Sequence, residues 1–124
     1  MHLMIQTAAI IYILIVFLVI VFQFCLIGGA PWGRITQGGR YQGALPYSGR
    51  VAAGFSALLL VFMAVGVASE AGMITTLPKW IANTGLAIQS LSAILNWITP
   101  SRAERLLWGP ITTIMLLLAA YVAI

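Results

Sequence analysis

Charged residues are scarce in this sequence, and their scarcity restricts the class of protein it encodes. Only 6% of the 124 residues are Asp, Glu, Lys or Arg, whereas about a quarter is usual in a soluble domain. Six basic and two acidic side chains cannot cover the surface of a water-soluble globule of this length. With 62% hydrophobic residues, the chain is predicted to form a single integral membrane domain over residues 1–124.

Cysteine and histidine are almost absent, since each occurs once, as Cys25 and His2. One cysteine cannot form a disulfide within the chain, and the two residues are too few to hold a metal ion or a haem. No Ser or Cys has the histidine and acid partners of a catalytic triad. The stretch GRITQGGR lacks the Lys and the Ser or Thr of a phosphate-binding loop. We therefore predict no metal site and no catalytic residue, and the sequence identifies no cofactor.

Long apolar runs, in contrast, are abundant. A helix that crosses the membrane needs roughly 20 apolar residues. Four segments satisfy this length, at about residues 3–27, 51–69, 79–98 and 101–124. We do not interpret the first as a cleaved signal peptide, because no basic residue precedes it and its apolar run is too long. The segments predict an all-α fold, an integral membrane four-helix bundle with up-down topology.

The sequence SRAE predicts where the fourth helix starts. Ser101 with Glu104 three residues later has the pattern of a capping box, in which each side chain bonds the other residue's backbone N–H. Pro100 disfavours a helical conformation at the residue before it. We therefore expect the helix to begin at Ser101 and to be kinked near Pro110, which lacks a backbone donor.

The basic residues predict the orientation in the membrane. Four spans place both termini on one side and the connections 28–50 and 99–107 on the other. Lys79 is the only basic residue on the side of the termini. By the positive-inside rule, the termini are outside and the two other connections are cytoplasmic. The cytoplasmic basic residues are Arg34, Arg40, Arg50, Arg102 and Arg105.

Two spans carry stripes of small or polar residues at helical spacing, which suits close packing of helices in lipid. In the second span the stripe consists mostly of alanines and includes Val61. We expect the stripes to pack together, with Gln89 and Asn96 forming hydrogen bonds between helices; a polar path for a solute is the alternative. The residues predicted for helix contacts or the path are Ala53, Ala57, Ala64, Gln89, Ser92 and Asn96.

The connection 28–50 is long for a link between neighbouring spans, which commonly needs roughly 2–8 residues. Its glycines would let backbone N–H groups approach an anion, and its arginines join those of the connection 99–107 on one surface. We expect these five arginines and Trp32 to bind lipid headgroups or a partner protein. Anionic lipids, rather than nucleic acid, are the expected counterpart of the net charge of +4.

Two parts of the chain resemble a known group of proteins. GAPWG at residues 29–33, the Gly38-Gly39 pair, Leu45-Pro46 and Arg50 form the first part, and TPSRAERLLWGP at residues 99–110 forms the second. Both resemble a group of small four-span bacterial membrane proteins of unknown function. The resemblance implies a multi-pass protein of the bacterial inner membrane. It implies no reaction, ligand or catalytic residue.

Three functional hypotheses follow. The first is a non-enzymatic membrane protein that serves as an accessory or structural subunit of a larger complex, with other subunits or a second copy as partners. It is favoured by the absence of charge in the middle of any span, because such charges mark most ion pathways. The alternative is a small channel or transporter with a polar path along the third span. The last is a lipid-handling membrane enzyme, whose only candidate base is Glu104.

Overall fold

The structure is a computed structural model that describes residues 2–124, so Met1 of the predicted domain lies outside it. The chain forms the helices α1 (His2–Ile27), α2 (Tyr47–Glu70), α3 (Lys79–Ile98) and α4 (Arg102–Ala123). Two short 3-10 turns, η1 (Gly33–Ile35) and η2 (Gln37–Gly39), lie between α1 and α2. No strand occurs among the described residues, and the prediction of an all-α fold is confirmed.

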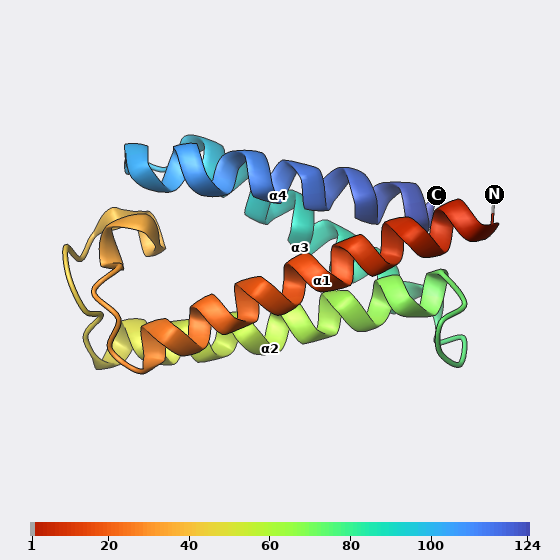
Figure 1. Ribbon diagram of the computed structural model, residues 1–124, viewed down its shortest axis with the longest axis horizontal. Coiled ribbons are helices and arrows are strands. Elements are labelled where there is room, and N and C mark those ends of the chain that lie inside the picture. The colour runs from red at the N-terminus through yellow and green to blue at the C-terminus, as the bar shows by residue number, and fades with distance from the viewer. Residues whose placement is uncertain (1) are drawn as a thin grey trace.

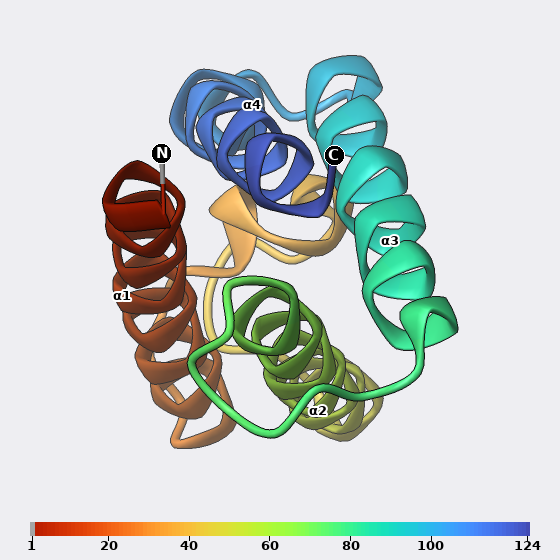
Figure 2. The same ribbon diagram turned by 90° about the vertical axis from the view of Figure 1, so that its right-hand side faces the viewer.

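The helices surround a common axis. Each packs mainly against two neighbours: α1 and α3 both contact α2 and α4, while α2 and α4 touch each other less extensively (Figure 2). Both termini and the connection between α2 and α3 lie at one end of the molecule, which we call the terminal end (Figure 1). The turns η1 and η2 and the connection between α3 and α4 lie at the opposite end, which we call the loop end (Figure 1).

Three of the helices, α1, α2 and α4, are long and apolar enough to cross a membrane. Large hydrophobic side chains such as Leu14, Leu18 and Leu58 are exposed on their outer faces. Exposing these apolar side chains to water would be unfavourable, whereas contact with lipid is favourable for them. The fold is therefore that of a small helical membrane protein. Helix α3 has the predicted bounds but is not among the three, because amides and hydroxyls interrupt its apolar residues.

The helix bounds differ from the predicted ones mainly in α2, which begins at Tyr47 rather than Val51. Pro46 stands at its N-cap, where its fixed φ and missing N–H cost nothing. In α4, Ser101 is the N-cap and its side chain accepts a hydrogen bond from the Glu104 backbone N–H at 3.2 Å. The helix continues unbroken through Pro110.

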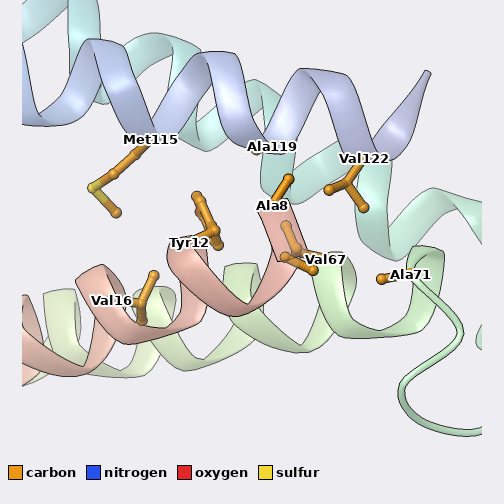
Figure 3. Packing of buried hydrophobic residues seen from close by; sticks show 9 residues of the cluster. Ala8, Tyr12, Val16, Val67, Ala71, Met115, Ala119 and Val122 are labelled. Atoms are coloured by element: carbon orange, nitrogen blue, oxygen red, sulfur yellow. The ribbon is translucent and has the colours of Figure 1, made fainter. Parts of the chain in front are cut away.

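The terminal half of the core is apolar. Its buried cluster joins α1, α2 and α4, with Tyr12 and Met115 among its largest members (Figure 3). Small residues such as Ala8 and Ala119 let the helix backbones approach closely, which is the main source of helix association in lipid. Val61 was predicted to belong to the packing face of α2, and this was wrong, since 49% of it is exposed.

A cavity at the loop end

The loop half of the bundle contains a cavity of about 800 Å³ that is partly open to the outside. All four helices contribute to its wall, and residues of the η1–η2 region, including Thr36 and Gly38, cover its loop end. Most of the wall is apolar. The polar side chains that line it come mainly from α3 and from the loop end, and they include Gln37, Ser92, Asn96, Thr99 and Glu104.

The cavity exists because α2 and α3 meet at the terminal end and separate towards the loop end. A Cβ built on Gly66 would lie 3.1 Å from the Cα of Ala82, and one on Gly85 would lie 3.4 Å from the Cα of Met63. The α2 side chains in the cavity wall all precede or include Met63, whereas those of α3 all follow Gly85. Figure 1 shows α3 running from the terminal end of α2 to the loop end of α4. The two helices thus form a V, with the glycines at its vertex.

Gln89 closes the cavity towards the terminal end. It is buried, accepts a hydrogen bond from the Tyr12 hydroxyl at 2.9 Å, and donates one to the Thr112 carbonyl at 3.2 Å. These bonds join α3 to α1 and to α4, so the amide is satisfied without water or ligand. Beyond Tyr12 the core consists of the apolar cluster. The polar lining therefore ends at the middle of the bundle.

Glu104 anchors the cover of the cavity at the loop end. It is only 6% exposed, and its two carboxylate oxygens accept hydrogen bonds from the Thr99 hydroxyl and, at 3.3 Å, from the Gly38 N–H. The predicted capping box is therefore only half correct, because the carboxylate bonds the loop instead of the Ser101 N–H. That N–H instead donates to the Thr99 hydroxyl at 3.3 Å.

Two further hydrogen bonds hold the loop on α4. The Ser101 hydroxyl donates to the Arg34 carbonyl at 2.6 Å, and the Trp108 indole N–H donates to the Ile35 carbonyl at 2.7 Å. The loop backbone also approaches itself closely at Gly33, where a Cβ would lie 2.3 Å from the Tyr41 carbonyl oxygen. The length of the connection between α1 and α2 is thus explained by its packing as a cover over the bundle.

The five arginines predicted to bind headgroups or a partner fall into two groups. Arg50 donates to the carbonyls of Leu45 and Ile27, and Arg105 donates to the carbonyl of Thr99, so both stabilise the loop end internally. The other three are exposed, and only one of them lines the cavity. The exposed arginines are Arg34, Arg40 and Arg102, of which Arg40 lines the cavity.

Trp32, the aromatic residue of the same predicted site, lies against α1 instead of the arginines. Its ring stacks on Phe22 with centroids 5.7 Å apart, and Phe22 in turn meets the edge of Trp108. Trp32 is partly exposed at the loop end, while Trp108 and Phe22 line the cavity.

The residues predicted for helix contacts or a polar path occupy different places. Ala53 and Ala57 are buried, and Ala64 is half-buried beside the apolar cluster. Ser92 and Asn96 line the cavity, but the Asn96 amide donates to the Ser92 carbonyl within α3 at 2.8 Å. Only Gln89 among the predicted amides bonds to other helices.

Three residues of the site were not predicted from the sequence: Thr36 and Thr112, which line the cavity, and Tyr12, which bonds Gln89 at its inner end. A hydrogen bond from Tyr12 could have been predicted from the sequence, because a tyrosine in the middle of an apolar span requires a partner for its hydroxyl. The place of Thr36 in the cavity wall could not have been predicted, since it depends on the folding of the loop. No group of metal-ligating side chains able to hold an ion occurs between His2 and Ile124.

Comparisons with protein families, with curated proteins and with solved structures show no significant match to this chain. The apolar helices and the cavity define a class, a small helical membrane protein with an open cavity at one end. The resemblance to small bacterial four-span proteins remains a prediction.

Proposed function

We propose that this chain is a non-enzymatic, four-span protein of the bacterial inner membrane that binds one amphipathic molecule in its loop-end cavity. In this proposal α3 also crosses the membrane, as the third of four spans in an up-down bundle. Both termini are outside, and residues 28–50 and 99–107 are cytoplasmic. The distribution of arginines along the chain supports this orientation.

The proposal rests on the cavity and on its lining, which combines apolar side chains along the wall with polar groups at the loop end. A volume of about 800 Å³ falls within the roughly 300–1,000 Å³ typical of small-molecule sites. Leu59, Leu60 and Ile88 give its wall an apolar character, whereas Gln37 and Thr99 supply polar groups at the loop end. A molecule with an apolar body and a polar end matches this order of side chains.

A channel or transporter is less well supported. A continuous polar path would have to pass Gln89, whose amide is held by Tyr12 and Thr112, and then the apolar cluster of the terminal half. An enzyme is also less well supported. Glu104 is the only carboxylate that lines the cavity, and both of its oxygens already bind loop-end donors.

Mass spectrometry of the molecules that co-purify with the protein in mild detergent tests the proposal. Ser56, a half-buried residue of α2, lines the cavity, whereas Ala52 is exposed one turn earlier and does not. We expect an amphipathic compound to be present at one molecule per chain in the native protein and in Ala52→Phe. It should be largely lost in Ser56→Phe, in which the ring fills the cavity. The proposal fails if the native protein carries no such compound and takes up none from a panel of amphiphiles.

An accessory subunit of a membrane complex is the second candidate. It is favoured by the exposed Arg34 and Arg102, which sit on a loop end held by several side-chain hydrogen bonds and thus present cations on an ordered surface. Ordered surfaces of this kind bind partners with little entropic cost. Native purification followed by analysis of subunit composition tests it, and a lone chain without a stoichiometric partner would count against it.

A further inference from the structure

We propose that the ligand of the cavity is an anionic phospholipid that enters sideways from the bilayer between α2 and α3. One of its acyl chains would occupy the V between the two helices, and its phosphate would lie beside Arg40. The inference rests on the proposed function and adds the class of ligand, the route of entry and the residue that selects the headgroup.

The route of entry follows from the rim of the cavity. Leu91, Leu95 and Ile98 line the cavity, yet 56%, 52% and 70% of their respective surfaces remain exposed. Residues that face both the cavity and the outside mark its opening. They follow Gly85 on α3, where this helix has moved away from α2, so the opening lies between these helices. An opening bordered by exposed apolar side chains gives access to lipid rather than to water.

The order of side chains along the opening matches the order of groups in a lipid. From the vertex outwards the α2 side of the wall presents Met63, Leu60 and Leu59, which are apolar. Near the loop end it presents polar residues, including Gln37 and Thr99. A lipid whose acyl chain enters the V would therefore have its headgroup at the level of the loop, where headgroups of the surrounding bilayer also lie.

The charges at the loop end select an anionic headgroup. Arg40 lines the cavity, is exposed, and donates no side-chain hydrogen bond to any of the residues 2–124. Its guanidinium lies over the Tyr41 ring, 6.0 Å from the ring centroid. Glu104, the opposing charge in the wall, is buried and already bound by Thr99 and Gly38. Arginine presents paired donors that match phosphate oxygens, so Arg40 is the available phosphate ligand.

Native mass spectrometry of the purified protein tests this inference. The protein is stripped of lipid and incubated with phosphatidylglycerol or with phosphatidylcholine of the same acyl chains. We expect one phosphatidylglycerol per chain to be retained in preference to phosphatidylcholine. Arg40→Gln should reduce this preference about fivefold, the scale expected for one basic side chain at an anionic surface. Arg34→Gln is the matched control, because Arg34 is also exposed but does not line the cavity.

The outcomes separate the two proposals. If Arg40→Gln and Arg34→Gln behave alike, or if phosphatidylcholine is retained equally, the assignment of Arg40 and of an anionic lipid is overturned while the cavity site stands. If the cavity retains only a non-lipid amphiphile, or glycerol phosphate without an acyl chain, the lipid is likewise excluded. If lipid binding is equal in the native protein and in Ser56→Phe, the bound lipid is not in the cavity, and sideways entry is wrong.

Discussion

Gly39 of the loop lies directly against Ser101 at the start of α4. A Cβ built on Gly39 would stand 2.5 Å from the Cβ of Ser101, and the glycine has a φ of +70°. Both features require glycine, the first because there is no room for a side chain and the second because the left-handed conformation disfavours one. This contact allows Thr36, Gln37 and Gly38 to close the loop end of the cavity.

Replacing Gly39 should therefore detach the loop from α4. We expect Gly39→Ala to lower the free energy of unfolding by about 2–5 kcal/mol, from left-handed strain of about 1–2 kcal/mol and overpacking of about 1–3 kcal/mol. Thermal unfolding in detergent measures the loss. Gly43→Ala is the control, because nothing lies within 4 Å of its Cβ position and its φ is not positive. Equal effects of the two substitutions would contradict the packing argument.

Glu104 should control the order of the loop. In Glu104→Gln the acceptor of the Gly38 N–H loses its charge, so a hydrogen bond worth about 1.5–3 kcal/mol with a charged acceptor is weakened. We expect faster amide hydrogen exchange in residues 33–40, with little change in α1. Glu70→Gln is the matched control, since Glu70 pairs with Lys79 at the terminal end. Exchange in residues 33–40 that stays at the native rate in Glu104→Gln would show that the carboxylate does not hold the loop.

The hydrogen bond between Tyr12 and Gln89 should stabilise the middle of the bundle. Gln89→Leu leaves the buried Tyr12 hydroxyl without its partner. Hydrogen bonds between membrane helices are worth about 0.6 kcal/mol on average and up to about 1.7 kcal/mol, so we expect a loss in this range. Unfolding in mixed micelles, measured for Gln89→Leu, Tyr12→Phe and the double variant, gives the coupling energy. Strictly additive losses would mean that the two side chains do not interact.

The vertex of the V should be sensitive to the volume of one residue. A Cβ at Gly66 would lie 3.1 Å from the Cα of Ala82, and backbone atoms cannot move aside as a flexible side chain can. We expect Gly66→Ala to cost about 1–3 kcal/mol of unfolding free energy by overpacking. The control, Gly54→Ala in the same helix, meets its nearest atom at 3.8 Å. It should be neutral or stabilising, because alanine favours the helix by about 1 kcal/mol over glycine. Similar losses at both positions would indicate that α2 and α3 do not meet closely at Gly66.

Periodicity and length were sufficient to predict the helices. The bounds of α1, α3 and α4 lie within one residue of the predicted segments, because long apolar runs flanked by glycine, proline and a Ser101 cap leave few alternatives. Helix α2 extends one turn further towards the loop than predicted, since the polar Ser48 and Arg50 hid its first turn. The local residue pattern says little about where a helix begins when its first turn is polar and is covered by other parts of the chain.

The amino-acid sequence by itself determined the class of protein, its helices and the side of the bundle on which the arginines gather. These properties depend on composition and on neighbours close in the chain. Tertiary structure alone decided that α2 and α3 form a V, that Glu104 binds Gly38, and that Arg40 rather than Arg50 lines the cavity. Glu104 and Gly38 are separated by 66 positions in the chain, and no local preference encodes a contact over that distance. The cavity follows from how the helices pack, and packing is set by the fit of whole helix faces.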